Sequence, residues 1–317
     1  MKIKSFSKLL DIIRKRNNFV LASHVNYDED SISSLVLMAN ILKKFNKRFI
    51  IYFEEKIKEE HNWLPYQEKF TSKIKENFEN VIILDCESYK RTGNFFSEWC
   101  EKKFKINIDH HLTNKYDSEV NFVLPESPST SFILLKIYQK LKIIDPLMAS
   151  ILLLGIMGDT NYLTIEFDKK RLKSILKALC FLNDSDADFN LVNRTLNYKS
   201  WDNFLEEIRI LSKVKKLGNI IYLIVESKED KKAGNLANVL NKIREGKLVI
   251  VFKVFKDFIR LSFRSKGNID VGYLAKKFFN GGGHKNSSGG ILRMKIKEAL
   301  PYVLKIAQKH LNLKKND

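Results

Sequence analysis

The 317-residue sequence contains only three cysteines, Cys86, Cys100 and Cys180. Their spacing is not that of a metal-binding motif, and their odd number leaves at least one thiol unpaired. This pattern suits a reducing compartment rather than an oxidising one. We therefore expect the protein to be cytoplasmic.

Long hydrophobic runs are also absent. The longest, from residue 149 to residue 157, is far below the roughly 20 apolar residues needed to cross a bilayer. Near the N-terminus, Asp11, Arg14 and Lys15 interrupt the apolar residues, which predicts a helix rather than a signal peptide. We expect no membrane span, and the sequence shows no internal repeat or low-complexity segment.

Positive charge, by contrast, is in excess. Lysine and arginine total 56 against 37 acidic residues, a formal net charge of +19. Such a field attracts anions, so nucleic acid, nucleotides and anionic membranes are candidate partners. Alternatively, the excess of positive charge reflects lysines on exposed helix faces that bind no particular partner. The length and the 44% hydrophobic content are typical of a soluble protein with two domains.

In the first half of the sequence, short strand-like segments alternate with helix-like segments. The strand-like segments lie at residues 19–22, 49–53, 81–84 and 105–108. Their length and composition are typical of buried parallel strands. Strands that alternate with helices imply an α/β fold with a mostly parallel sheet covered by helices.

The second half changes character. Its strand-like segments lie at residues 220–225, 248–255 and 258–263, and its helix-like segments lie at residues 233–244, 270–278 and 297–311. We expect a first domain at residues 1–190, a connecting helix at 191–216 and a smaller α/β domain at 217–317. A cleft between the two domains is the expected ligand pocket.

Acidic and histidine side chains follow three of the predicted strands, and one more acid ends a predicted helix. The set comprises His24, Asp28, Asp30, Asp85, Asp109, His110, His111 and Asp159. In open α/β sheets, ligands bind at the carboxyl ends of strands. Each residue alone has a structural explanation, such as a helix cap or a turn. Their agreement in type, order and position favours a site.

The chemistry of this set predicts a metal centre. Carboxylate and imidazole donors without thiolate suit divalent ions such as manganese. Two ions about 3.5–4 Å apart can hold the attacking and leaving oxygens of a phosphoryl displacement. Bound cations would also neutralise acids that otherwise repel one another. The pattern predicts a two-metal phosphoesterase.

The Asp-His-His triplet at residues 109–111 resembles the motif that gives the DHH phosphoesterase superfamily its name. The segments at residues 24–30 and 158–160 and the acid at position 85 resemble the other motifs of that superfamily. The resemblance covers nearly the whole chain. It implies that residues 1–190 form a metal-binding catalytic domain.

The resemblance also implies a ligand set for two manganese ions, with magnesium or cobalt as substitutes. One ion would be held by His24, Asp28 and Asp85. The other would be held by Asp30, Asp85, His110 and Asp159, so that Asp85 bridges the pair. Asp109 would orient a neighbouring ligand, and His111 would contact the substrate phosphate or the metal-bound water.

A glycine-rich motif occupies residues 280–290. Consecutive glycines let backbone N–H groups approach an anion, although a plain turn is the commoner explanation. The motif resembles the DHH-associated substrate-binding domain, and Arg264 offers a guanidinium upstream of it. The substrate contacts implied are Arg264, Gly281, Gly282, Gly283, His284, Ser287 and Ser288, with Arg264 and His284 also catalytic.

Two domains without an additional nucleic-acid module are similar to the NrnA-like subgroup. This resemblance implies hydrolysis of short RNA or DNA oligonucleotides, or of cyclic dinucleotides such as cyclic di-AMP and their linear products such as pApA, to mononucleotides. Dephosphorylation of 3′-phosphoadenosine 5′-phosphate is the alternative. Whether the chain forms a homodimer is left open.

Several positions depart from the common pattern of the superfamily. They are Tyr27, Glu29, Phe132, Asn161, Tyr162, Leu163, Asn280, Ser287 and Ser288. Phe132 and residues 161–163 leave the choice of substrate open, because they could reshape the pocket.

Three other functions are alternatives. The high charge favours a long-strand exonuclease, but the chain lacks an additional nucleic-acid-binding domain. The glycine-rich histidine loop argues against an inorganic pyrophosphatase or polyphosphatase. A non-catalytic nucleotide- or RNA-binding regulator would need a broken ligand set, and every ligand position is filled.

Overall fold

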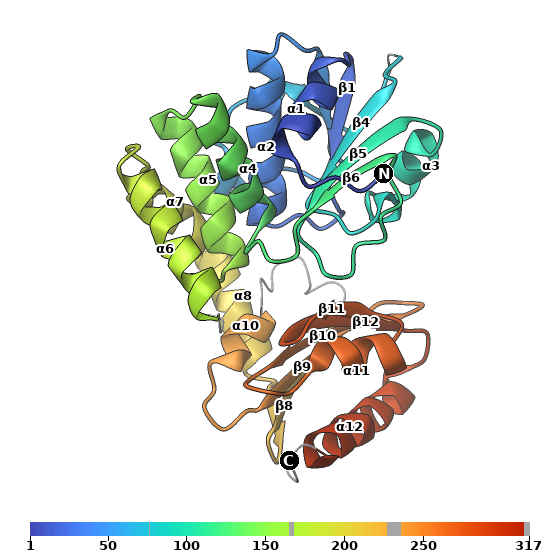
Figure 1. Ribbon diagram of the computed structural model, residues 1–317. Coiled ribbons are helices and arrows are strands. Elements are labelled where there is room, and N and C mark those ends of the chain that lie inside the picture. Colours follow the sequence, from blue (N-terminus) through green and yellow to red (C-terminus); the bar gives the residue numbers. More distant parts are fainter. Residues whose placement is uncertain (76, 165–167, 227–235, 314–317) are drawn as a thin grey trace. The chain divides into compact units, whose positions relative to one another are not determined.

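The computed structural model describes residues 1–75, 77–164, 168–226 and 236–313, with the backbone alone for His284 and residues 312–313 (Figure 1). The chain divides into two compact units, Met1–Tyr198 and Lys199–Asp317. Each unit has its own sheet and its own hydrophobic core. No described helix has the length and apolar character of a membrane span.

A six-stranded parallel sheet forms the centre of the first unit. Its strands are β1 (Phe19–Ala22), β2 (Phe49–Tyr52), β3 (Phe70–Thr71), β4 (Asn80–Leu84), β5 (Phe104–Asp109) and β6 (Val120–Val123). They lie in the order β3-β2-β1-β4-β5-β6. The predicted α/β fold with a parallel sheet is confirmed. The sequence did not predict the edge strands β3 and β6.

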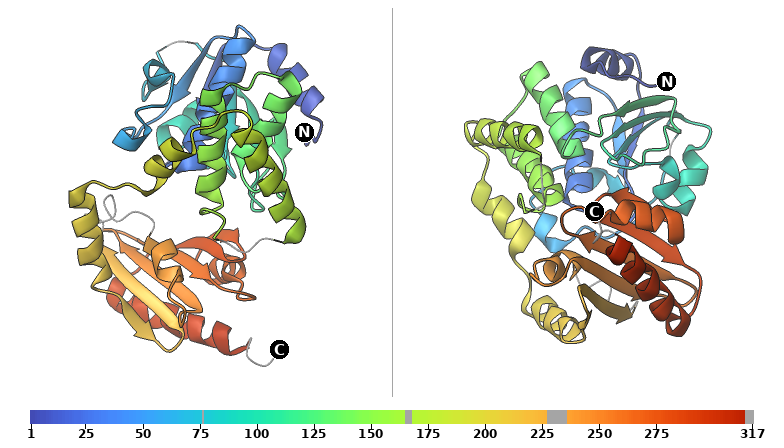
Figure 2. Two further views of the ribbon diagram at one scale, coloured as in Figure 1. Left: turned by 90° about the vertical axis from the view of Figure 1, so that its left-hand side faces the viewer. Right: turned by 60° about the horizontal axis from the view of Figure 1, so that its bottom comes forward.

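Helices cover both faces of this sheet. They are α1 (Phe6–Arg14), α2 (Glu29–Lys44), α3 (Asn94–Cys100), α4 (Thr130–Leu141), α5 (Pro146–Asp159), α6 (Lys169–Asn183) and α7 (Phe189–Asn197). The main core lies between one sheet face and α1, α2, α4 and α5, and α3 packs on the other face. Helix α5 also packs against α6 and α7, which lie beside it in Figure 2.

Local sequence signals explain where these helices begin. Asp28, Ser129, Asp145 and Asp168 each accept a hydrogen bond from the backbone N–H three residues later and so cap α2, α4, α5 and α6. Pro146 occupies the first turn of α5, where its missing N–H is tolerated. Two of these helix starts, those of α2 and α4, lie at the candidate site.

The sheet register brings three polar segments together. Strands β1, β4 and β5 are neighbours and parallel, so their carboxyl ends share one edge of the sheet. Leu84 pairs with Ile108, which places Asp85 level with Asp109. The segment that contains His24 follows β1 at the same edge.

The second unit contains a mixed six-stranded sheet in the order β11-β12-β10-β9-β8-β7. Its strands are β7 (Lys215–Leu217), β8 (Ile220–Glu226), β9 (Leu248–Val254), β10 (Ile259–Ser265), β11 (Gly282–His284) and β12 (Ser287–Leu292). Among the strands that the structure describes here, only β8 and β9 pair in parallel. Helices α11 (Val271–Phe278) and α12 (Ile296–Leu313) cover one face, and α8 (Trp201–Leu211) and α10 (Leu236–Asn241) cover the other.

The region expected to be a connecting helix, residues 191–216, holds three elements. It contains most of α7, all of α8 and the start of β7. The helix expected at residues 233–244 is described as α10, while residues 233–235 lie outside the described part of the chain.

Candidate metal centre

The turn between β1 and α2 supplies two of the expected ligands, His24 and Asp28, and the first turn of α2 supplies a third, Asp30. Asp28 caps α2 through Oδ1, which accepts a hydrogen bond from Ser31 N at 3.0 Å. The other carboxylate oxygen of Asp28, Oδ2, lies 3.8 Å from Nε2 of His24. The capping role and a ligand role are therefore compatible, because they use different oxygens.

Asp30 lies in the first turn of α2, and its buried carboxylate faces the N-terminus of α4. Its Oδ2 accepts a hydrogen bond from Thr130 N at 2.7 Å, and its Oδ1 accepts one from Ser131 N at 2.8 Å. Burial, followed by the charges of Asp85 and Asp159, raises the pKa of Asp30 well above its usual range. The helix terminus favours the ionised form, and a cation beside this carboxylate would favour it further.

Asp85 lies between two histidines. Its Oδ2 is 3.8 Å from Nε2 of His24, and its Oδ1 is 3.4 Å from Nε2 of His110. Thr130 Oγ1 donates to Oδ1 at 3.0 Å. Burial opposes ionisation, but the hydrogen bond with His110 and the nearby imidazoles outweigh it and lower the pKa of Asp85. The two oxygens of this carboxylate thus face different groups of ligands.

Two residues of the Asp-His-His triplet, Asp109 and His111, belong to a hydrogen-bonded chain that continues to Asn114 and Asn107. Oδ1 of Asp109 lies 2.7 Å from Nδ1 of His111, and Oδ2 accepts a hydrogen bond from Asn114 Nδ2 at 2.6 Å. Asn107 accepts a further hydrogen bond from Asn114 at 2.7 Å. Burial disfavours the imidazolium of His111, but the adjacent Asp109 carboxylate outweighs it and raises the pKa of His111 to about 9.

Asp159, the last residue of α5, completes the centre. Its Oδ2 lies 3.3 Å from Nε2 of His110. The other ring nitrogen of His110, Nδ1, lies 3.4 Å from the backbone carbonyl of Ser127. Burial raises the pKa of Asp159 to about 6, although the His110 charge opposes the shift.

The eight residues predicted in the first unit lie at one edge of the sheet. Ligand atoms that lie within 4.8 Å of one another form three groups: His24, Asp28 and Asp85; Asp30, His110 and Asp159; and Asp85, His110 and His111. Asp85 belongs to two of these groups. Carboxylate and imidazole donors without sulfur suit hard or borderline divalent cations. This donor set therefore fits a pair of such ions that share Asp85.

Arg264 lies in the second unit on β10. Its Nε donates to Oδ1 of Asn238 on α10 at 2.6 Å, and its Nη1 donates to the backbone carbonyl of Phe263 at 2.9 Å. Arg264 also pairs with Ser287 of β12 across the sheet. The first two contacts fix the guanidinium against α10, and the strand pairing places the backbone of Arg264 next to the glycine-rich hairpin.

The glycine-rich segment forms the β11–β12 hairpin, and close backbone approach explains part of its composition. A Cβ on Gly281 would lie 1.8 Å from the carbonyl oxygen of Gly289, and Gly283 has a φ of +135°. Only glycine fits these two positions without a rearrangement. Ser288 is buried, and its hydroxyl donates to the carbonyl of Val271 at 2.7 Å. The side chain of His284 lies outside the described part of the chain.

Two models of known protein families match the chain, one within each of its two compact units. A family model described as "DHH family, N-terminal domain" matches residues 18–156, and one described as "DHHA1 domain" matches residues 217–312. The chain belongs to the DHH family. A relative named bifunctional oligoribonuclease and PAP phosphatase NrnA, from Mycoplasma genitalium, is 26% identical over 309 residues, which cover 93% of this chain and 95% of that protein.

Two solved structures show the same fold as this DHH protein. An exopolyphosphatase-related protein from Bacteroides fragilis is similar with a TM-score of 0.80 and 22% identity, over 98% of this chain and 96% of that chain. RecJ from Thermus thermophilus in complex with Mn2+ is similar with a TM-score of 0.53 and 15% identity, over 96% of this chain and 54% of that chain.

The sequence did not identify several residues that hold the metal centre of this DHH protein in place. Thr130 and Ser131 donate hydrogen bonds to Asp30, 100 and 101 positions away in the chain, and Thr130 also donates to Asp85, 45 positions away. Asn114 could have been suspected, because it lies five residues after Asp109. For Thr130 and Ser131, the sequence predicted only that a helix begins there.

Proposed function

We propose that this DHH-family hydrolase cleaves the phosphodiester bonds of short oligonucleotides, or of linear or cyclic dinucleotides, and releases mononucleotides. The observation that carries the proposal is the position of Asp85, whose two oxygens face separate ligand groups at one sheet edge. A shared carboxylate is the arrangement expected of a two-metal phosphoesterase.

In this proposal, His24, Asp28 and Asp85 hold one divalent ion, and Asp30, Asp85, His110 and Asp159 hold the other. We assign manganese, with magnesium or cobalt as substitutes, and the manganese complex of RecJ supports that choice. When bound, the ions supply Lewis acidity for the attack of water on phosphorus.

The residues of the chain contribute orientation and charge. With Nδ1 of His111 held by Asp109, we assign Nε2 of His111 to a non-bridging phosphate oxygen. Asn114 contacts Asp109 and Asn107 and so holds the Asp109 carboxylate in place. That carboxylate in turn orients the His111 imidazole. A preorganised donor of this kind stabilises the charge that develops in the transition state.

We assign substrate binding to the second domain. Arg264 and His284 would contact the substrate phosphate, and Gly281, Gly282, Gly283, Ser287 and Ser288 would shape the loop that carries His284. The hydrogen bond from Arg264 to Asn238 supports this role, because it limits the orientations of the guanidinium. The DHHA1 match over residues 217–312 supports it as well.

A second candidate is dephosphorylation of 3′-phosphoadenosine 5′-phosphate. The name of the Mycoplasma genitalium relative combines an oligoribonuclease with a PAP phosphatase, and the two reactions could use the same metal centre.

The three free thiols are in keeping with a cytoplasmic location, which we include in the proposal.

The direct test is a substrate panel. Cyclic di-AMP, pApA, 3′-phosphoadenosine 5′-phosphate, short RNA oligonucleotides and a long single strand are incubated side by side with and without manganese. We expect manganese-dependent release of mononucleotides from the short substrates and little cleavage of the long strand. Faster cleavage of the long strand would favour an exonuclease, and no cleavage of any substrate would refute the proposal.

A further inference from the structure

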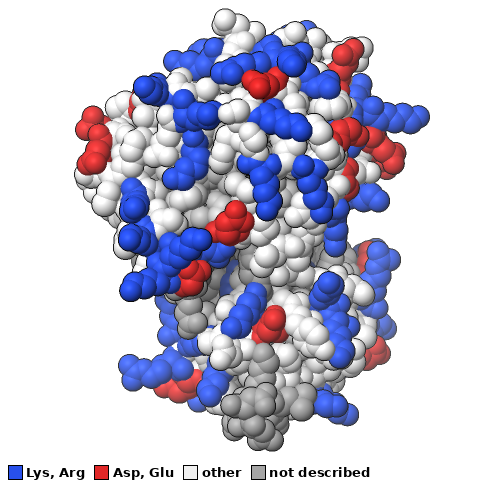
Figure 3. Space-filling view, viewed as in Figure 1, with Lys and Arg blue, Asp and Glu red and all other residues white. Residues whose placement is uncertain are grey.

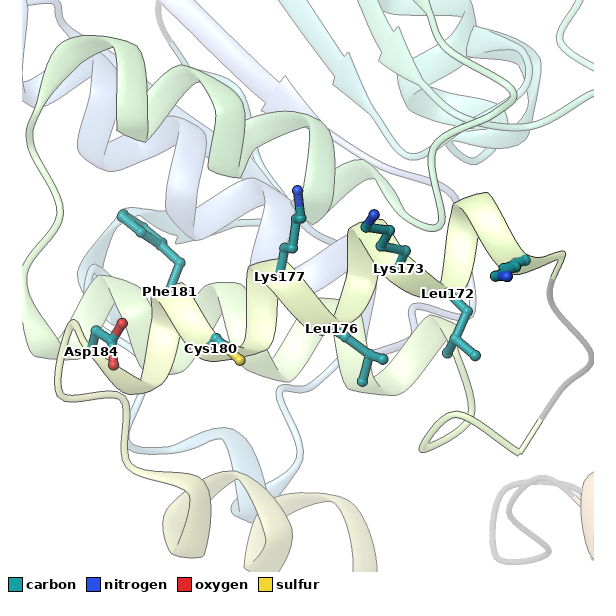
Figure 4. A pocket seen from close by; sticks show the side chains of 8 residues that line it. Leu172, Lys173, Leu176, Lys177, Cys180, Phe181 and Asp184 are labelled. Carbon is teal, nitrogen blue, oxygen red and sulfur yellow. The ribbon is translucent and has the colours of Figure 1, made fainter.

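Three lysines from two helices of the first unit form a positive cluster. Lys136 lies on α4, and Lys173 and Lys177 lie on α6; all three are exposed. None of them forms an ion pair with an acid in the described ranges. Figure 4 shows Lys173 and Lys177 along one edge of α6, with Leu172 and Leu176 along the other.

The charges of Lys136 and Lys177 are close enough to affect one another. Partial burial and, after it, the charge of Lys177 lower the pKa of Lys136. The ammonium of Lys136 also lies 5.0 Å from the ring centroid of Phe132. Like charges placed together without an acid repel one another, and a bound anion would relieve that repulsion.

The spacing of the lysines suits a polyanion. Lys169, Lys173 and Lys177 recur every four residues on α6, and each step advances about 6 Å along the helix axis. That step is close to the separation of successive phosphates in an unstacked single strand. Lysine and arginine also outnumber acids over much of the surface seen in Figure 3.

Both helices begin beside the metal centre. Thr130, in the first turn of α4, contacts Asp30 and Asp85. Arg171, in the first turn of α6, donates to the backbone carbonyls of Pro125 at 2.8 Å and Glu126 at 3.1 Å. These two residues directly precede Ser127, whose carbonyl contacts His110. The lysine cluster therefore lies one to two helical turns from the segments that build the centre.

We propose that Lys136, Lys173 and Lys177 bind the backbone phosphates of an oligonucleotide beyond the bond that is cleaved. This inference rests on the proposed function, and it gives the protein a means to hold substrates longer than a dinucleotide. A nucleic acid suits the cluster better than a membrane does. The cations come from two helices beside a phosphodiester site, whereas the exposed apolar edge of α6 is narrow.

Binding and kinetics test the proposal separately. The double variant Lys136→Gln/Lys177→Gln is compared with wild type and with Lys4→Gln/Lys8→Gln, which removes the same charge near α1. The affinity for a labelled hexanucleotide is measured by fluorescence anisotropy in EDTA, where no hydrolysis occurs. We expect the α4–α6 variant to bind about fivefold more weakly and the control variant to bind as wild type does.

Hydrolysis supplies the second readout. The KM for the hexanucleotide should rise by a similar factor, and kinetics with pApA, which is too short to reach the cluster, should not change. The salt dependence of hexanucleotide binding should weaken by about 0.7 log units per lost phosphate contact. If wild type hydrolyses none of the short substrates, the proposed function fails, and anisotropy still decides this inference.

Three results would overturn the inference. The first is equal weakening in the α1 control, which would indicate non-specific attraction. The second is unchanged hexanucleotide affinity in the α4–α6 variant. The third is loss of binding to phosphatidylglycerol vesicles in that variant with hexanucleotide affinity intact, which would identify a membrane contact instead.

Discussion

The missing side chain of Gly155 decides where the carboxylate of Asp30 can lie. A Cβ at this position of α5 would lie 2.0 Å from Ser131 Oγ and 2.9 Å from Asp30 Oδ1. Gly158, one turn later, makes similar room for the side chain of Glu29. Two glycines on one helix thus let α5 approach the first turns of α2 and α4, and α2 carries the expected ligand Asp30.

Gly155→Ala should disturb the metal centre without removing a ligand. Because Ser131 must move to admit the methyl group, the hydrogen bonds that hold Asp30 should be lost. We expect a loss of about 1–3 kcal/mol in the free energy of unfolding and about 10- to 100-fold weaker manganese binding, measured by urea denaturation and calorimetry. Gly289→Ala, whose Cβ would make only a 3.4 Å contact, is the control. Unchanged manganese affinity in Gly155→Ala would contradict this account.

At the scale of elements, one segment between β2 and β3 is anchored to the β1–α2 turn by Tyr27. The Tyr27 hydroxyl accepts a hydrogen bond from Lys58 N at 2.8 Å and lies 3.4 Å from Nδ1 of His61. His61 is fully buried. Burial, followed by the charge of Lys58, lowers its pKa from 6.5 to about 3.

This histidine should make the stability of the first unit depend on pH. Because its pKa is lower in the folded state, the unfolded chain binds the proton more tightly. The stabilisation is complete above pH 6.5 and is lost as the pH falls toward 3. Between pH 7 and pH 4 the loss should be about 3 kcal/mol. In urea denaturation, the stability difference between wild type and His61→Gln should shrink over this range. A constant difference would show that His61 does not titrate on unfolding.

The strands that could be predicted include residues 19–22, 81–84 and 105–108, and all three lead into the candidate metal centre. The first two are apolar throughout, the third alternates polar and apolar residues, and a histidine or an acid follows each of them. Strand β3 has only two residues, and β7 is fully exposed, so neither carries a hydrophobic signal. Contacts such as that of Thr130 with Asp85 depend on tertiary packing, which local sequence does not encode.

At the scale of the whole molecule, we expect the two units to divide the work. The first carries every predicted metal ligand, and the second carries Arg264 and the glycine-rich hairpin. Each unit folds around its own core. Substitutions in the second unit should therefore alter catalysis without altering metal content.

His284→Ala tests that division. We expect turnover of pApA to fall steeply, because a proposed phosphate contact is lost, while the manganese content stays equal to that of wild type. Elemental analysis after dialysis gives the metal content, and steady-state kinetics give kcat and KM. If His284→Ala lost manganese instead, His284 would be a metal ligand and its assignment to the substrate would be wrong.

The central claim is that Asp85 is shared between two metal ions, and counting bound manganese tests it most directly. At a free manganese concentration that saturates wild type, isothermal titration calorimetry should detect two ions per chain in wild type and one in Asp28→Asn. In Asp85→Asn, which removes a ligand from both ions, it should detect none. A single ion in wild type, or two ions retained by Asp85→Asn, would contradict the account.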